Sequence, residues 1–137
     1  MTTANAKRLG LEVSDSPLGL IDGIRKGLKK GAVDYVVKAL EINASEISRF
    51  LHVSPRTLYR YKPDETLSLD TSDHLAQIYK VYVRATEVFG DDRKALGWLK
   101  HPSMPLGNMT PLDLLDTSAG VEMVLEELGR IEYGVYA

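Results

Sequence analysis

Residues 43–62 read NASEISRFLHVSPRTLYRYK, and this stretch decides the fold of the N-terminal half of the chain. Three apolar residues recur at i, i+3 and i+4, which predicts an amphipathic helix over 44–51: Ile47, Phe50 and Leu51. Asn43 or Ser45 can cap that helix. After a two-residue turn, Ser54 is a typical N-cap and Pro55 suits the first position of a second helix. Two short helices joined by a tight turn indicate a helix-turn-helix.

The second of these helices is basic, which makes DNA binding the first hypothesis. A recognition helix needs donors near its N-terminus for base edges and cations for phosphates. The candidates for base contacts are Arg56, Thr57 and Arg60, and the candidates for phosphate contacts are Ser54, Tyr59 and Lys62. The alternative is an ordinary helical hairpin with a solvated basic face, because most charge runs on helices mean no more than that.

Charge is divided unevenly along the 137 residues, although the net charge is only −2. Residues 21–62 hold nine Lys and Arg against four Asp and Glu, whereas residues 63–137 hold six against thirteen. The basic part suits a polyanion, and the acidic part is expected to face a protein. The chain has no cysteine and no long apolar run, so we expect a cytoplasmic protein without disulfides or a membrane segment.

Helical periodicity predicts further elements on both sides of the motif. One helix is expected over 18–30, ended by Gly31, and another over 32–41. A turn at 63–65 leads into a loop that is expected to tuck Leu67 and Leu69 inward. The longest helix is then expected to start at 72 or 73 and to end near 89.

The last helix is expected to start at Thr117 or Ser118, and three acidic residues are placed on its solvent side: Glu122, Glu126 and Glu127. A short aromatic tail follows at 133–137. No segment has the pattern of a strand, so the fold class is all-α, with a helix-turn-helix bundle packed with a small helical C-terminal domain. The expected parts are a mobile arm at 1–17, a DNA-binding domain at 18–70 and a helical domain for dimerisation or partner binding at 71–137.

The C-terminal half carries a set of short motifs that is distinctive as a whole. The motifs are ALGWL at 95–99, Pro102, LG at 106–107, TPLDLL at 110–115, Thr117, Gly120 and RIEYG at 130–134. Together with the helix-turn-helix, this set resembles the MbcA/ParS/Xre antitoxin family over about residues 18–137. The family commonly has Asn and Gly where this chain has Ser103 and Asn108. Because Asn tolerates a left-handed backbone, the loop shape is expected to survive.

The resemblance implies an all-helical antitoxin of a bacterial type II toxin–antitoxin system. Its partner would be a cognate RES-domain toxin that acts on NAD or transfers ADP-ribose from it, with the active-site entrance covered by the antitoxin's C-terminal region. The resemblance also implies a homodimer that binds the operator of its own operon. The toxin-contact candidates are Glu126, Arg130, Tyr133, Gly134, Val135 and Tyr136. Tail aromatics suit this role because such residues dominate interface energies.

The residues do not predict an enzyme, a metal site or a cofactor. His52, His74 and His101 are far apart in sequence, and there is no Cys to complete a metal-ligand pattern. Two other functions remain open. One is a stand-alone transcriptional repressor whose C-terminal half dimerises or senses a ligand, and the other is a protein-interaction module that has lost DNA binding.

Overall fold

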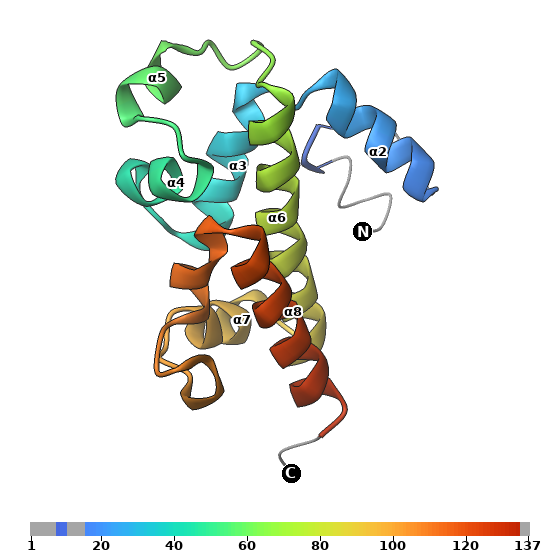
Figure 1. Cartoon of the computed structure of the whole chain (residues 1–137), viewed down its shortest axis with the longest axis vertical. Helices are drawn as coiled ribbons and strands as arrows, with labels where there is room; N and C mark the ends of the chain where they lie inside the picture. The colour runs from blue at the N-terminus through green and yellow to red at the C-terminus, as the bar shows by residue number, and fades with distance from the viewer. Residues whose placement is uncertain (1–7, 11–15, 135–137) are drawn as a thin grey trace. The chain divides into compact units, whose positions relative to one another are not determined.

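The computed structural model describes residues 8–10 and 16–134, which are built from helices and short connections (Figure 1). No strand occurs in these two ranges, so the predicted all-α fold is confirmed. The elements are α2 (Pro17–Lys26), α3 (Lys30–Leu40), α4 (Ala44–Leu51), α5 (Pro55–Arg60), α6 (Leu69–Phe89), α7 (Asp92–Leu99), the 3-10 helices η1 (Met104–Leu106) and η2 (Pro111–Asp116), and α8 (Ser118–Glu132). The chain divides into two compact units between Ala76 and Gln77, within α6.

The first unit is built around the helix-turn-helix. Its largest inaccessible side chains include Leu28, Leu40, Ile47, Phe50 and Leu75. The segment that follows α5 returns to the start of α3, where the Lys30 amide donates to the Glu65 carbonyl at 2.9 Å and the Leu67 amide donates to the Leu28 carbonyl at 2.8 Å. These long-range bonds fix the position at which α3 begins.

The end of α2 differs from the prediction. The helix ends at Lys26 and is capped by Gly27, which has a φ of 95°. This conformation favours glycine, and a Cβ at Gly27 would overlap the side chain of Thr66. Gly31, the predicted stop, lies instead in the first turn of α3, where its amide donates to the Pro63 carbonyl at 2.9 Å. The prediction was wrong because nothing in the local sequence indicates that the segment around Thr66 packs against Gly27.

The start of α6 also differs from the prediction. The helix begins at Leu69, because the hydroxyl of Ser68 accepts a first-turn amide at 3.2 Å. Ser72, one of the two predicted starts, is fully buried, and its hydroxyl accepts the Leu28 amide at 2.9 Å. Of the two leucines expected to point inward, Leu67 is buried, but Leu69 is 52% exposed.

The second unit packs α8 against η2 and η1, and α7 against η2. Its most deeply buried side chains include Ala95, Leu99, Leu115, Val124 and Leu128. Thr117 caps α8 by accepting the Gly120 amide at 2.9 Å. Helix α8 and η2 approach so closely that a Cβ at Gly120 would overlap the Leu114 carbonyl. In the loop before η2, Asn108 has a φ of 63°, the left-handed conformation that was expected to preserve the loop.

Part of the expected N-terminal arm is described. Leu9 is only 1% exposed, and Ser16 caps α2 by accepting the Gly19 amide at 3.0 Å. Pro17 is the first residue of that helix. The described part of the arm is therefore anchored, and residues 1–7 and 11–15 lie outside the described residues. Of the helices in the described ranges, none combines the length and the apolarity that crossing a bilayer requires.

Candidate functional site

The helix-turn-helix has strong local signals at both ends of its first helix. Asn43 caps α4 by accepting the Glu46 amide at 2.8 Å, and the Glu46 carboxylate accepts the Asn43 amide at 3.3 Å. This reciprocal capping box decides between the two predicted caps in favour of Asn43. His52 ends the helix with a φ of 57°. The bounds predicted for this helix, 44–51, are confirmed.

The cap of α5 restricts what Ser54 can do for a ligand. Its hydroxyl accepts the Thr57 amide at 3.1 Å and donates to the Thr57 hydroxyl at 2.9 Å. One role of Ser54 is therefore to start the helix, and its hydroxyl shares a hydrogen bond with the Thr57 hydroxyl. Leu58 is the one buried residue of α5 and anchors the helix to the first unit.

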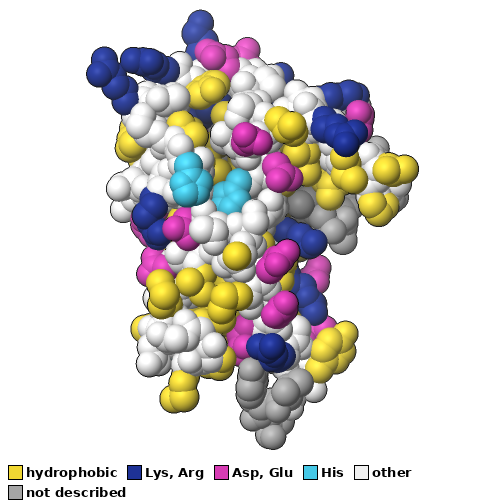
Figure 2. Space-filling model, in the orientation of Figure 1, with side chains coloured by type: hydrophobic (Ala, Val, Ile, Leu, Met, Phe, Trp, Pro, Cys, Tyr) yellow, Lys and Arg dark blue, Asp and Glu magenta, His cyan; other side chains and the backbone are white. Residues whose placement is uncertain are grey.

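The other predicted DNA contacts lie on the exposed surface of α5 and just beyond its end. Arg56, Tyr59, Arg60 and Lys62 are exposed, and Tyr59 reaches 71%. Figure 2 shows Lys and Arg side chains projecting from the corner of the first unit where Figure 1 places α5. The exposure of these cations leaves them accessible to a polyanion.

An acidic side chain lies among these cations. An open hollow of about 300 Å³ is lined by Thr57, Arg60, Tyr61 and Glu65. The Glu65 carboxylate accepts the backbone amide of Lys62 at 3.1 Å, so it is held in place. A carboxylate at this position disfavours a phosphate inside the hollow itself. Phosphate binding is expected at the projecting ends of the cations instead.

The candidates for toxin contact include exposed residues and one residue that is held by an ion pair. Glu126 is exposed, and so are Tyr133, at 81%, and Gly134, which has a φ of 69°. Arg130 is half exposed and lies 3.4 Å from the Glu127 carboxylate. The other two candidates, Val135 and Tyr136, lie outside the described residues.

The expected solvent position of Glu127 is wrong. Its side chain is only 2% exposed, and Arg130 forms an ion pair with it. Burial of a carboxylate is costly unless it is paired and hydrogen-bonded, so Arg130 has a structural task besides any contact with a partner. A change at Arg130 would leave the buried Glu127 charge less well compensated.

A second ion pair joins two helices of the second unit. The two terminal guanidinium nitrogens of Arg84 in α6, Nη1 and Nη2, donate to the carboxylate of Glu132 at the end of α8, each at 2.7 Å. This hydrogen bond lowers the pKa of Glu132 and raises that of Arg84. Glu87 adds a longer contact to Arg84 at 3.5 Å. The bidentate pair fixes the end of α8, from which the tail departs.

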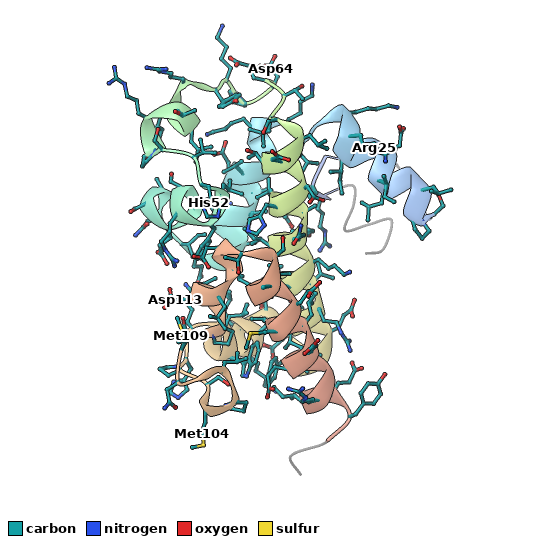
Figure 3. All side chains as sticks on the ribbon, in the orientation of Figure 1. Arg25, His52, Asp64, Met104, Met109 and Asp113 are labelled. Atoms are coloured by element: carbon teal, nitrogen blue, oxygen red, sulfur yellow. The ribbon has the colours of Figure 1, made fainter. Side chains whose placement is uncertain are left out.

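Sequence reasoning missed three exposed methionines on the second unit. Met104 is 82% exposed at the tip of the loop between α7 and η2, and its side chain points away from the helices (Figure 3). Met109 and Met123 are each nearly half exposed. Exposed methionines adapt well to a partner surface. The only sequence signal for this exposure was the position of Met104 between Ser103 and Pro105, in a loop segment that cannot form a long helix.

The three histidines do not assemble into a metal-ligand cluster within the described residues. The structure brings His52 and His74 together, with ring centroids 6.3 Å apart, although they are far apart in sequence. No group of three or more His, Cys, Asp or Glu in the described ranges could hold a metal ion.

Two family profiles match the chain. The profile of the antitoxin Xre-like helix-turn-helix domain matches residues 19–78. The profile of the antitoxin Xre/MbcA/ParS C-terminal toxin-binding domain matches residues 84–134.

Similar proteins that are named as antitoxins agree with these profile matches. Antitoxin Xre from Yersinia enterocolitica is 30% identical over 138 residues, covering 99% of this chain and 93% of the relative. The Prs ADP-ribosylating antitoxin from Sphingobium is 24% identical over 132 residues, covering 89% and 83%. A chain in the crystal structure of the M. tuberculosis MbcT-MbcA toxin-antitoxin complex shares the fold, with a TM-score of 0.57, 20% identity and coverage of 79% of this chain and 96% of that one. This chain belongs to the Xre/MbcA/ParS antitoxin family.

Proposed function

We propose that this chain is the antitoxin of a toxin–antitoxin pair, with one surface for its toxin and another for operator DNA. The observation that carries the proposal is the match of residues 84–134 to a toxin-binding domain, beside a helix-turn-helix match at 19–78. We assign residues 18–70 to DNA and residues 71–137 to the toxin and to dimerisation. The antitoxin acts by stoichiometric binding and not as an enzyme.

The DNA-binding part of the proposal rests on the side chains of α5. Arg56 and Thr57 are exposed in its first turn, where a recognition helix meets base edges. Arg60, the third candidate for a base contact, and Lys62, a candidate for a phosphate contact, follow as exposed cations. Base-edge donors near the start and phosphate-binding cations near the end suit sequence-specific binding better than a solvated hairpin does.

Substitution of α5 residues tests this part. Arg56→Ala is expected to weaken specific operator binding by about 1–3 kcal/mol, because it removes a base contact. Lys62→Ala is expected to weaken binding to all sequences and to reduce the slope of log affinity against log salt by about one. Lys80→Ala, an exposed cation of the second unit, is the matched control. Unchanged operator affinity of Arg56→Ala in a gel-shift series at fixed salt would contradict the assignment.

The toxin-binding part of the proposal rests on the end of α8 and the tail. Glu126 and Tyr133 are exposed there, and Arg130 is half exposed. The proposed toxin is a RES-domain protein that consumes NAD or transfers ADP-ribose, and the antitoxin covers its active-site entrance. The names of the Sphingobium relative and of the mycobacterial complex support this toxin class.

Removal of residues 133–137 tests this part. The truncated protein is expected to fail to rescue cells that express the toxin, and to keep its operator affinity, because α5 is unchanged. Operator binding serves as the folding control. Full rescue by the truncated protein would exclude the tail as the essential contact, and attention would move to Glu126 and Arg130.

The partner and the assembly can be tested in one experiment. Co-expression with the adjacent gene is expected to yield a stable complex that contains two antitoxin chains and the RES-domain toxin. Light scattering of the purified antitoxin and of the complex would measure both stoichiometries. A chain without a neighbouring toxin gene, which binds DNA but no toxin, would instead be a stand-alone repressor.

A further inference from the structure

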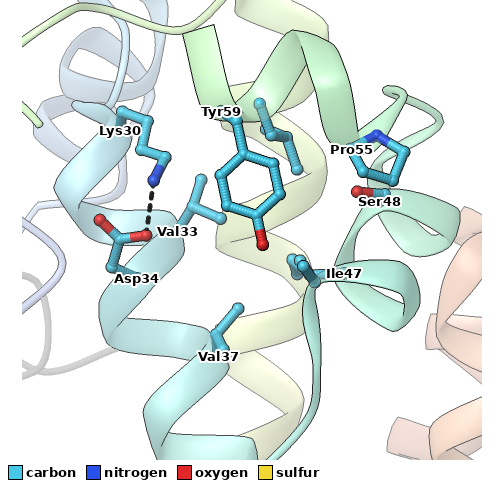
Figure 4. Close-up of a pocket in the computed structure, with 10 residues that line it drawn as sticks. Lys30, Val33, Asp34, Val37, Ile47, Ser48, Pro55 and Tyr59 are labelled. Atoms are coloured by element: carbon cyan, nitrogen blue, oxygen red, sulfur yellow. Dashed lines mark hydrogen bonds and ion pairs between the residues drawn. The ribbon is translucent and has the colours of Figure 1, made fainter. Parts of the chain in front are cut away.

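Helix α5 has two distinct faces besides its exposed tip. One face borders a pocket between α3, α4 and α5, where the Tyr59 ring lies over the space (Figure 4). The other face borders the open hollow of about 300 Å³ that is lined by Thr57, Arg60, Tyr61 and Glu65. Thr57 and Arg60 are three residues apart, so they share one side of the helix. The hollow therefore lies beside two of the three candidates for base contacts.

The turn that follows α5 holds the Glu65 carboxylate in this hollow. The Glu65 backbone amide donates to the Lys62 carbonyl at 3.0 Å, and the Glu65 carbonyl accepts the Lys30 amide at 2.9 Å. One oxygen of the Glu65 carboxylate accepts the Lys62 amide at 3.1 Å. An ionised carboxylate has about four acceptor positions, so it can still accept a hydrogen bond from a ligand. Because its backbone and side chain are both held, Glu65 loses less conformational freedom on binding than an unrestrained side chain does.

A carboxylate is unexpected on a surface that binds DNA. Like charges repel, so Glu65 weakens the attraction of the nearby cations for the phosphate backbone of every sequence. A base edge that donates a hydrogen bond to the carboxylate would offset this effect at one sequence only, which is a common way to achieve specificity. In the major groove, the donors on base edges are the amino groups of cytosine N4 and adenine N6.

The order of groups along the base-pair edge distinguishes these two bases. A G·C pair presents two adjacent acceptors, guanine N7 and O6, beside the cytosine amino group. In an A·T pair, the adenine amino group lies between two acceptors, so a guanidinium fork would meet a donor. The Arg60 guanidinium offers the donors that match guanine, and the Glu65 carboxylate offers the acceptor that matches cytosine. Both side chains line the same hollow, so the pair of them fits a G·C edge better than an A·T edge.

We propose that Arg60 and Glu65 together read one G·C base pair of the operator. Arg60 donates to guanine O6 and N7, and Glu65 accepts from the amino group of the paired cytosine. Glu65 is then a specificity-determining residue, since it favours this pair and disfavours phosphates and base edges that carry only acceptors. The inference rests on the proposed function, because it assigns a sequence preference to the same DNA-binding surface.

Selection from a library of randomised duplexes tests the role of Glu65, with the full-length wild type, Glu65→Gln and Asp64→Asn. Gln keeps an oxygen that can accept the Lys62 amide, but it removes the charge and replaces one acceptor with a donor. Asp64→Asn removes the same charge from an exposed neighbour that is not among the residues lining the hollow, and it is the matched control. The wild type is expected to discriminate one G·C pair of the selected site from the other base pairs at least about tenfold, in titrations at fixed salt.

Glu65→Gln is expected to lower the discrimination at this one pair at least about threefold, because it removes a hydrogen bond to a charged group. Asp64→Asn is expected to leave it unchanged. Unaltered discrimination in Glu65→Gln would overturn the inference, and so would a loss spread evenly over all base pairs, which a purely structural role in the turn predicts. If the wild type selected no sequence, the proposed operator binding would fail, and the inference with it.

A second measurement uses the wild type alone, so it does not depend on the folding of a variant. Each cytosine of the selected site is replaced in turn by N4-methylcytosine, which still pairs with guanine but carries a methyl group in place of the amino hydrogen that faces the major groove. The affinity is expected to fall at least about threefold at the cytosine of the discriminated pair. Full affinity after replacement of every cytosine would overturn the contact from Glu65.

Discussion

Ser48→Ala is expected to stabilise the protein, which is unusual for a substitution at a buried position. Ser48 lies in α4, is 5% exposed and has an unpaired hydroxyl. In the unfolded chain, water hydrates that hydroxyl, and in the folded chain this hydration is lost without replacement. Removal of the oxygen therefore removes a cost that only the folded state bears.

The expected gain in the free energy of unfolding is about 1–2 kcal/mol. The unsatisfied hydroxyl costs roughly 1–3 kcal/mol, and Ala is a better helix former than Ser by up to about 0.5 kcal/mol. The opposing effect is the volume of one lost oxygen, which adds a few tenths of a kcal/mol of cavity cost at most, at roughly 24 cal/mol per Å³. Ser45→Ala, at an exposed position of the same helix, measures the helix-propensity effect without the buried hydroxyl.

Urea unfolding followed by two signals measures this difference. Circular dichroism reports on all helices, whereas fluorescence reports on Trp98, the single tryptophan, in the second unit. Coincident transitions would justify one unfolding free energy for the chain. A Ser48→Ala protein no more stable than Ser45→Ala would refute the reasoning, because it would mean that a water already satisfies the Ser48 hydroxyl.

Three further predictions concern the capping and packing of the two units. Asn43→Ala removes the capping box of α4 and is expected to lower the unfolding free energy by about 1 kcal/mol in the same urea assay. Gly120→Ala places a methyl group on the Leu114 carbonyl and is expected to cost about 2–3 kcal/mol, and a neutral result would contradict the close packing of η2 on α8. The Arg84 hydrogen bond lowers the pKa of Glu132, so its stabilisation is present above the unfolded-state pKa and is lost as the pH falls through the folded-state pKa. The stability difference between wild type and Glu132→Gln should therefore shrink from pH 7 towards pH 3, and a difference independent of pH would exclude this pair as its source.

The elements with local signals could be predicted from the sequence. The bounds of α4 follow from its apolar spacing and its cap, and the start of α5 follows from Ser54 and Pro55. Each signal acts within one turn of helix, so no distant residue is needed to interpret it. The start of α8 at a Thr cap is of the same kind.

The elements that depend on distant residues could not be predicted. The end of α2 depends on the approach of Thr66 to Gly27, and the role of Ser72 depends on the Leu28 amide, 44 residues away. In both cases two segments meet only after the chain has folded. Local propensity therefore placed the stop at Gly31 and a helix start at Ser72.

Glu127 is a different kind of error, because a signal for its burial was present. It follows Val124 at i+3, which places it on the buried side of α8, yet its charge suggested solvent. Periodicity predicted the correct face, and Arg130 provides the pairing that makes burial of the carboxylate possible. The charge of the Glu127 side chain was therefore a less reliable predictor of its exposure than the helical periodicity.

The structure also affects how mutations at the proposed toxin surface can be interpreted. Arg130 pairs with the buried Glu127, so loss of toxin binding in an Arg130 variant could come from a lost contact or from a disturbed α8. Tyr133 has no such ambiguity, because its side chain is 81% exposed and follows the last residue of the helix. A substitution at Tyr133 changes the surface with little effect on the fold. Loss of neutralisation in a Tyr133 variant therefore identifies a contact more directly than the same loss in an Arg130 variant.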